Sequence, residues 1–293
     1  MEVLKHCNLC PRACGVNRLV GVRGFCRAGG RPKVARADLH YWEEPCLSGS
    51  RGSGAVFFSH CNLRCIFCQN YRISWQGRGR EMTVGELAAL FLDLQARGAH
   101  NINLVSPTPY SPFIIPALQE ARQQGLKLPV IYNCNAYESI ASLRSLEGLV
   151  DIYLPDLKYV APGPAGRYSY TPDYFPVATA AILEMQRQVG TLTLGPDGLA
   201  RRGLLIRHLV LPGQVQAACR VLDWIKASLP RETYISLMAQ YVPVWQASRC
   251  AEVNRRLTAA EYEIVLDYMG YLGLENGYYQ ELEAATTDYI PDF

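Results

Sequence analysis

From about residue 55 onward, short apolar runs alternate with longer amphipathic segments. The runs have the length and the β-branched, apolar content of buried strands, whereas the segments between them carry apolar residues at helical spacing. We expect strands at residues 55–59, 101–105, 128–133, 150–154, 204–210 and 233–238. We expect helices near residues 84–97, 113–124, 138–146, 172–189, 214–229 and 259–272.

Three of these helices have sequence signals for their first residues. Thr83 with Glu86, and Thr258 with Glu261, form the pattern of a capping box, in which a threonine and a glutamate bind each other's backbone N–H groups. Thr171 precedes a proline, and proline is favoured at the first position of a helix. We therefore expect Thr171 to cap the fourth helix.

Strands that alternate with helices indicate βαβ crossovers and a parallel sheet. Six strands are fewer than the eight of a complete barrel, so we predict an α/β fold with an open, partial (β/α)6 barrel over residues 51–250. Residues 1–50 are rich in Cys, Arg and Gly without sustained periodicity, and we interpret them as a small irregular N-terminal unit. Residues 251–293 add a C-terminal helix and a tail, in which residues 278–293 are expected to wrap around the barrel.

The composition is that of a globular protein. Of 293 residues, 49% are hydrophobic and 19% are charged, and the net charge of +3 is too small to predict a nucleic-acid or membrane-surface partner. No run approaches the ~20 apolar residues that span a bilayer. Residues 1–7 lack the apolar segment of a secretory signal. We therefore expect a cytoplasmic protein with neither a nucleic-acid nor a membrane partner.

Eleven cysteines are the most informative feature of the composition. In a reducing compartment they do not pair as disulfides, so clustered thiols indicate a metal or iron–sulfur site. Cys61, Cys65 and Cys68 have the spacing C-x3-C-x2-C and follow the first predicted strand, at the mouth where barrel enzymes place their chemistry. A [4Fe–4S] cluster usually takes four thiolates, so three would leave one iron open to a small molecule. The alternative is a zinc ion with these three ligands and one more.

Four further cysteines lie in the N-terminal unit with the spacing C-x2-C-x3-C-x11-C, namely Cys7, Cys10, Cys14 and Cys26. Four thiolates in a segment without a core of its own predict a closed structural site that holds either zinc or a second iron–sulfur cluster. The spacing does not distinguish between these metals. The alternative is four independent buried thiols.

With Phe67 directly before the last cysteine of the C-x3-C-x2-C motif, the sequence resembles the radical S-adenosylmethionine (SAM) superfamily. The resemblance implies that Cys61, Cys65 and Cys68 bind a [4Fe–4S] cluster whose open iron is chelated by the amino and carboxylate groups of SAM. It also implies that an electron from a flavodoxin- or ferredoxin-type donor breaks the S–C5′ bond and forms a 5′-deoxyadenosyl radical, which abstracts hydrogen from the substrate. In such enzymes the protein orients the cofactor and excludes water.

Over nearly the whole chain, the sequence looks most like the glycyl-radical-enzyme activating enzymes, in particular the branch labelled pyruvate formate-lyase 3-activating enzyme. The segments that carry this resemblance are residues 7–12, 52–54, 68–71, 153–159, 207–213, 236–241 and 289–293. The resemblance implies that Asp156, Lys158 and Arg207 lie near the cofactor, because they match an Asp-x-Lys after the fourth strand and an arginine on the fifth. A lysine ammonium there would pair with the cofactor carboxylate.

Two segments depart from the pattern of this family. Residues 106–109 are Ser-Pro-Thr-Pro instead of a Gly-Gly-Glu type segment, and residues 133–136 are Asn-Cys-Asn-Ala instead of Asp-Thr-Asn-Gly. The second change removes the carboxylate of a monovalent cation site. Asn133 and Asn135 would remain as hydrogen-bonding groups for the cofactor.

The function implied by the resemblance is that of a radical SAM oxidoreductase that activates a glycyl radical enzyme such as pyruvate formate-lyase. An alternative within this class is a radical SAM enzyme that modifies a small metabolite or a peptide. An alternative outside it is a zinc-stapled binding module without turnover. No catalytic residue is assigned.

Overall fold

The computed structural model describes residues 2–286, and its strands form one ten-stranded sheet in the order β10-β9-β8-β6-β5-β4-β2-β1-β3, with β7 paired to β8 outside this path. The strands are β1 Lys33–His40, β2 Ser53–Phe58, β3 Arg80–Glu81, β4 Ile102–Val105, β5 Val130–Cys134, β6 Ile152–Pro155, β7 Thr193–Leu194, β8 Ala200–Leu209, β9 Tyr234–Met238 and β10 Gly277–Tyr279.

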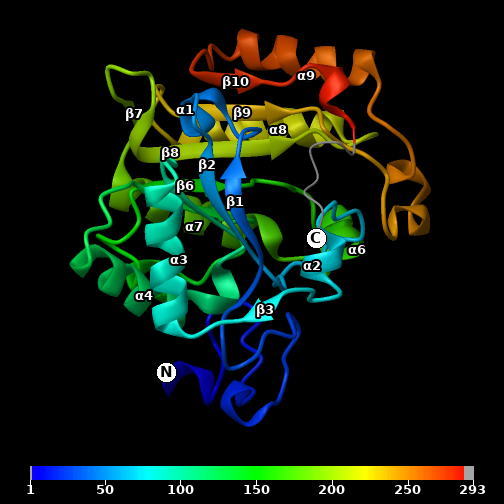
Figure 1. Ribbon diagram of the computed structural model, residues 1–293. Coiled ribbons are helices and arrows are strands. Elements are labelled where there is room, and N and C mark those ends of the chain that lie inside the picture. Colours follow the sequence, from blue (N-terminus) through cyan, green and yellow to red (C-terminus); the bar gives the residue numbers. More distant parts are fainter. Residues whose placement is uncertain (1, 287–293) are drawn as a thin grey trace.

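The sheet from β2 to β10 forms the wall of a partial barrel. Within it, β2, β4, β5, β6, β8, β9 and β10 each pair in parallel with the next strand in this order. The first six of these are the strands that the hydrophobic runs predict. Among the described residues, the outer strands β10 and β3 do not pair with each other, so the sheet is open (Figure 1). The prediction of an α/β partial barrel is confirmed.

Strand β1 was not predicted, and the expectation of irregular structure throughout residues 1–50 is wrong for Lys33–His40. This strand pairs antiparallel with β2, with Leu39 opposite Gly54, and also with β3. Only Val34 in it is buried. The other positions are partly exposed, since the strand lies near the edge of the sheet. A strand of this kind leaves no hydrophobic run in the sequence.

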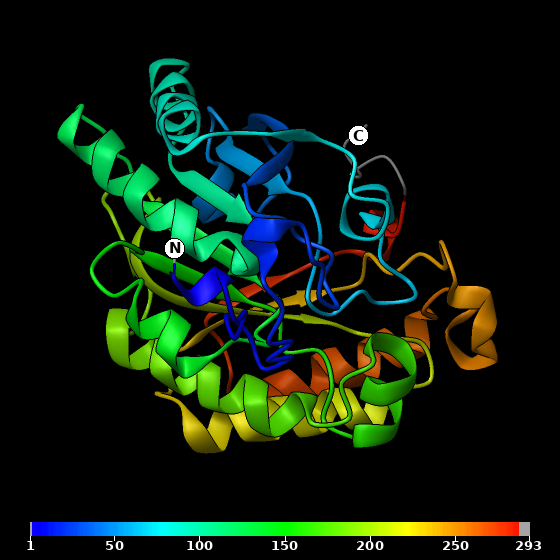
Figure 2. The ribbon, with the colours of Figure 1, turned by 90° about the horizontal axis from the view of Figure 1, so that it is seen from below.

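The helices lie outside the curved sheet, with α3 and α4 in one group and α7, α8 and α9 in another (Figure 2). The α-helices are α1 Pro45–Ser48, α2 Tyr71–Ser74, α3 Val84–Ala96, α4 Ser111–Gln123, α5 Ile140–Arg144, α6 Pro162–Ser169, α7 Tyr174–Val189, α8 Val215–Ser228 and α9 Ala259–Tyr271. Short 3₁₀ turns are η1 Glu2–Leu4, η2 Arg18–Val20, η3 Thr108–Tyr110, η4 Ala247–Arg249, η5 Ala251–Val253 and η6 Leu282–Ala284.

Both predicted capping boxes are present. The Thr83 hydroxyl accepts a hydrogen bond from the Glu86 backbone N–H, and the Glu86 carboxylate accepts one from the Thr83 N–H. Thr258 and Glu261 make the same pair of bonds at the start of α9. These two helices therefore begin where the sequence predicts.

The predicted cap at Thr171 is wrong. The helix α7 begins at Tyr174, two residues beyond the proline. Tyr170 ends α6 in the left-handed conformation, with φ +57°, and the buried Thr171 hydroxyl donates to the Ala165 carbonyl oxygen. Thr171 therefore helps to close the preceding helix instead of starting the next.

The C-terminal region extends the sheet. After α9 the chain returns as β10, which pairs in parallel with β9, at the opposite end of the molecule from the N-terminal segment (Figure 1). Residues 289–293, which carry part of the family resemblance, lie outside the described residues. None of the helices in residues 2–286 is long and apolar enough to cross a membrane.

Candidate active site

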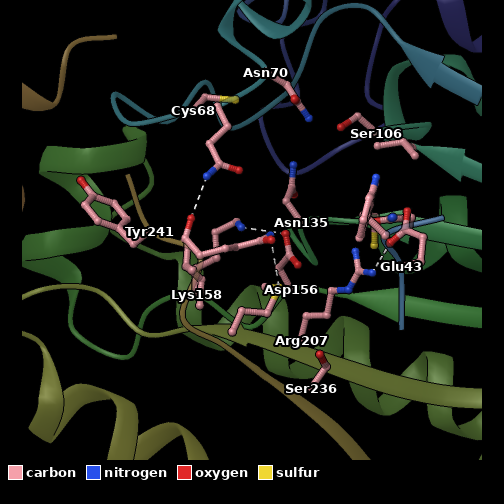
Figure 3. A pocket seen from close by; sticks show the side chains of 18 of the residues that line it. Glu43, Cys68, Asn70, Ser106, Asn135, Asp156, Lys158, Arg207, Ser236 and Tyr241 are labelled. Atoms are coloured by element: carbon pink, nitrogen blue, oxygen red, sulfur yellow. Dashed lines mark hydrogen bonds and ion pairs between the residues drawn. The ribbon is translucent and has the colours of Figure 1, made fainter. Parts of the chain in front are cut away.

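The carboxyl ends of the parallel strands meet around a cavity of about 380 Å³. Successive parallel strands each contribute to its wall, and the side chains point toward a common centre (Figure 3). The polar and sulfur-bearing side chains at this wall include Glu43, Glu44, Cys61, Cys65, Cys68, Ser106, Asn133, Asn135, Asp156, Lys158, Arg207, Ser236 and Gln240. All three cysteines of the motif and all five predicted cofactor-binding residues therefore lie at one cavity.

The loop after β2 brings the three cysteines to this wall. His60 and Arg64 adopt left-handed backbone conformations, with φ +71° and +57°, which are uncommon for residues with a side chain and curl the chain back on itself. The Ile66 N–H donates to the Tyr168 carbonyl oxygen at 2.9 Å, and the Ile66 carbonyl accepts from the Gln246 N–H at 2.8 Å. The loop is thus held from both sides.

Each cysteine sulfur accepts a hydrogen bond from a different part of the fold. Asn135 Nδ2 lies 3.4 Å from Cys61 Sγ, Ser169 Oγ lies 3.0 Å from Cys65 Sγ, and Ser74 Oγ lies 3.2 Å from Cys68 Sγ. Hydrogen bonds to sulfur stabilise the thiolate form that binds iron. Sequence reasoning missed Ser74 and Ser169, because nothing in the sequence sets these serines apart from others.

The donor set fits an iron–sulfur cluster. Burial raises the pKa of Cys65, and it raises the pKa of Cys68 to about 12, so these thiols need a metal to become thiolates at neutral pH. Within residues 2–286, no group of three or more His, Cys, Asp or Glu side chains is arranged to hold a metal ion. A zinc ion needs its ligands to converge on one point, so this finding counts against the zinc alternative. The thiolates of a cubane cluster bind different irons and need not converge in this way, so the finding does not count against the cluster.

Lys158 and Asp156 form a partly buried ion pair at the end of β6, with Nζ 2.7 Å from Oδ2 (Figure 3). Burial lowers the pKa of Lys158, but the Asp156 carboxylate together with the charges of Cys65 and Cys68 outweighs it, so that the pKa of Lys158 is raised and the ammonium form is kept. The Tyr174 hydroxyl lies 2.6 Å from the Asp156 carbonyl oxygen and 2.9 Å from that of Asn135. It thereby joins the ends of β5 and β6.

Arg207 is held by two acidic residues that sequence reasoning missed. Its Nε donates to Glu44 Oε1 at 2.7 Å, and its Nη2 donates to both Glu43 and Glu44. Burial raises the pKa of Glu44, but the Arg207 guanidinium outweighs it and leaves that pKa below its usual value. Glu43 also accepts from Asn103 Nδ2 at 2.8 Å. Arg207 therefore lies at the cavity with its charge already compensated.

The two asparagines have different surroundings. Asn135 uses its amide within the protein, since Nδ2 also donates to Asn62 Oδ1 at 2.8 Å and Oδ1 accepts from the Tyr137 N–H at 3.0 Å. Asn133 lies on the cavity wall beside Ser106, whose N–H donates to the Asn133 carbonyl oxygen. Asn135 is placed to hold Cys61, whereas Asn133 lines the cavity, and its role in binding a cofactor stays a prediction.

The N-terminal cysteines lie apart from the cavity. Cys7 is buried, and Cys10, Cys14 and Cys26 are partly buried. Burial raises the pKa of Cys10 to about 12, and the neighbouring thiols Cys26 and Cys14 add to this effect. Cys14 and Cys26 are therefore near enough to Cys10 for their negative charge to raise its pKa. Among residues 2–286, however, these thiols are not part of a group arranged to hold a single metal ion. The second metal stays a prediction.

Residues 55–163 match the model of the radical SAM superfamily, and this region contains the three motif cysteines, Asp156 and Lys158. The match supports membership of the radical SAM superfamily. Proteins of this superfamily are enzymes that use a [4Fe–4S] cluster and SAM. Arg207 and the N-terminal cysteines lie outside the matched region.

Two similar proteins add to this comparison. The uncharacterized protein MJ0674 of Methanocaldococcus jannaschii is 28% identical over 274 residues, which cover 91% of this chain and 75% of that protein. A solved structure described as native anSMEcpe with bound AdoMet has a TM-score of 0.47 and 12% sequence identity, covering 80% of this chain. This chain spans only 62% of that second protein.

Proposed function

We propose that this protein is a radical SAM enzyme whose [4Fe–4S] cluster is held by Cys61, Cys65 and Cys68. The observation that carries the proposal is that these three cysteines line one cavity at the carboxyl ends of the parallel strands, within the region that matches the superfamily. When bound, the reduced cluster would supply one electron to SAM, whose S–C5′ bond breaks to give methionine and a 5′-deoxyadenosyl radical that abstracts hydrogen from the substrate.

The residues of this chain bind and orient the reactants. The three thiolates hold the cluster, and Asn135, Ser169 and Ser74 fix their direction through hydrogen bonds to sulfur. Lys158 keeps its positive charge beside the cysteine loop and offers an ammonium group to the carboxylate of SAM. The buried wall around these groups limits the access of water, which would compete for the radical.

We further propose that the hydrogen donor belongs to a glycyl radical enzyme, as in activating enzymes. This proposal is supported by the position of the segments that resemble that family, because residues 68–71, 153–159, 207–213 and 236–241 all contribute to the cavity wall. A flavodoxin- or ferredoxin-type protein would supply the electron. Modification of a small metabolite or a peptide is the alternative within the same chemistry.

The decisive experiment compares the wild-type protein with Cys65→Ala and with Cys219→Ala as a matched control. Cys219 is a partly buried cysteine of α8 that does not line the cavity. Each protein is purified anaerobically, reconstituted with iron and sulfide, and mixed with dithionite and SAM. We expect 5′-deoxyadenosine from the wild type and from Cys219→Ala, and a loss of at least tenfold in Cys65→Ala.

Two outcomes would change the proposal. A colourless wild-type protein that binds zinc and forms no 5′-deoxyadenosine would favour the binding module without turnover. If 5′-deoxyadenosine forms, pyruvate formate-lyase is added as a probe to the same mixture, and a glycyl radical signal in electron paramagnetic resonance (EPR) is the expected result. Without that signal, radical SAM chemistry stands and the activating role is rejected for this probe.

A further inference from the structure

Arg12 of the N-terminal segment reaches the cysteine loop. Its Nε donates to the Asn62 carbonyl oxygen at 2.9 Å, its Nη2 donates to the Ser169 carbonyl oxygen at 3.0 Å, and its Nη1 donates to the Tyr170 carbonyl oxygen. The guanidinium also lies over the Phe25 ring, 3.7 Å from its centroid. A planar group with several donors in a fixed arrangement can join two chain segments in this way, whereas a lysine ammonium cannot.

The carbonyl groups that Arg12 binds need a donor. Ser169 is the last residue of α6, and Tyr170 follows it in the left-handed conformation. The last carbonyl groups of a helix have no partner within the helix, and a cation at this end is favourable. Asn62 and Ser169 are both buried, with 1% and 0% of their surface exposed. If the Arg12 guanidinium were removed, water could not easily take its place, and leaving these carbonyl oxygens without a hydrogen bond would cost free energy.

The same two residues control the surroundings of two cluster sulfurs. The Ser169 hydroxyl donates to Cys65 Sγ at 3.0 Å. The Asn62 side chain accepts from Asn135 Nδ2, and this same amide nitrogen lies 3.4 Å from Cys61 Sγ. Arg12 thus holds the backbone of two residues whose side chains set hydrogen bonds at Cys61 and Cys65, although it touches neither sulfur.

We propose that Arg12 is a positioning residue that tunes the reduction potential of the cluster through Asn62 and Ser169. This inference rests on the proposed function. Hydrogen bonds to the sulfurs of an iron–sulfur cluster stabilise the extra negative charge of the reduced state and raise its potential. Arg12 lies outside the region that matches the radical SAM superfamily, so this control is an addition of the N-terminal segment.

The test is a redox titration of the reconstituted protein, monitored by EPR, together with iron and sulfide analysis. We expect Arg12→Gln to keep its full iron content and to have a lower midpoint potential than the wild type. Arg12→Lys retains the charge without the planar set of donors, and we expect its potential to be lowered as well. Arg31→Gln, at an exposed arginine of the same segment, is the matched control and should leave the potential unchanged.

A double-mutant cycle separates positioning from general damage. Ser169→Ala removes the hydrogen bond to Cys65 and should lower the potential by itself. Because Arg12 acts through Ser169, the shift in the double variant Arg12→Gln/Ser169→Ala should be smaller than the sum of the two single shifts. If Arg12→Gln fails to retain the cluster, Arg12→Lys replaces it in the cycle.

Three outcomes would overturn the inference. These are an unchanged potential in Arg12→Gln and Arg12→Lys at full iron content, additive shifts in the double variant, and an equal shift in Arg31→Gln. Failure of the proposed function is recognised separately, because the wild-type protein itself would then assemble no cluster.

Discussion

At the scale of single residues, the charges around the cavity are paired, and this pairing decides which groups are available to a ligand. Lys158 is paired with Asp156, and Arg207 with Glu43 and Glu44. Glu138, which is not among the residues that line the cavity, is different, since it is a buried carboxyl group whose hydrogen-bond partners are neutral. Thr108 Oγ1 donates to it at 2.5 Å and the Tyr132 hydroxyl at 3.4 Å. Among residues 2–286, no cation donates a hydrogen bond to this carboxyl group, and burial disfavours its ionised form.

Glu138 should make the stability of the protein depend on pH. Burial raises the pKa of Glu138 from 4.5 to about 8. Between these values the folded state keeps a proton that the unfolded state has lost, so the free energy of unfolding falls as the pH rises from about 4.5 to about 8. In Glu138→Gln this contribution is absent. Relative to the wild type, the variant should gain on the order of 1 kcal/mol for each pH unit in this range.

Urea denaturation of the cluster-free protein at pH 5, 6, 7 and 8 measures this difference. Glu263→Gln, at an exposed position of α9, serves as the control and should follow the wild-type pH profile. Parallel profiles for the wild type and Glu138→Gln would contradict the prediction.

At the scale of elements, the sequence predicts strands and helices where burial leaves a pattern and misses them where it does not. The six predicted strands are buried in the sheet, and β2 is buried at every position. By contrast, β1 and β10 lie near the edges of the sheet and are mostly half-exposed, so neither has a run of apolar residues. These two strands carry or precede residues of the cavity wall, including Glu43, Glu44 and Gln280.

The position of β10 depends on Gly277. This residue has φ +142°, and a Cβ atom there would lie 1.9 Å from the Ile235 carbonyl oxygen of β9. We expect Gly277→Ala to separate β10 from β9, to destabilise the protein by roughly 1–3 kcal/mol, and to speed hydrogen exchange at residues 278–280. The Gln280 side chain, which accepts from the Ala239 N–H at 3.1 Å, would then leave the cavity wall.

Thermal unfolding and hydrogen exchange measured by mass spectrometry test this expectation. Gly270→Ala is the matched control, because a Cβ atom at this position of α9 meets nothing within 4 Å. That variant should be neutral or more stable by about 0.5–1 kcal/mol, as expected for alanine in a helix. Unchanged exchange at residues 278–280 in Gly277→Ala would show that β10 does not depend on the glycine.

At the scale of the whole molecule, the sequence predicts the residues that carry the chemistry of the site better than the contacts that hold those residues in place. The cysteine motif and the Asp156–Lys158 segment can be found because each lies within a few residues of the chain. The groups that support them come from distant segments, for example Arg12 to Asn62 and Arg207 to Glu44. Contacts of this kind depend on how the strands are ordered in the sheet, and one sequence without its fold does not reveal them.

The boundary that the sequence places after residue 50 can be tested on the whole molecule. Residues 1–50 include β1, and Leu4, Leu9 and Val34 belong to the same buried core cluster as Val56 and Phe58 of β2. Removing residues 1–50 would expose this core and would leave the largely buried Arg207 without Glu43 and Glu44. The loss of the partners of a buried charge alone costs about 3–5 kcal/mol.

We therefore expect a chain of residues 51–293 to lack a cooperative unfolding transition, as followed by circular dichroism and by tryptophan fluorescence during urea titration. The full chain with Glu43→Gln and Glu44→Gln isolates the contribution of the buried charge, and it should unfold cooperatively at a lower urea concentration than the wild type. A cooperative transition of the shortened chain near the wild-type midpoint would mean that residues 1–50 form a separate domain. The observed pairing of β1 with β2 argues against a separate domain. In the shortened chain β2 would become an uncovered edge strand with an exposed apolar face, so we expect that chain to lose its cooperative transition.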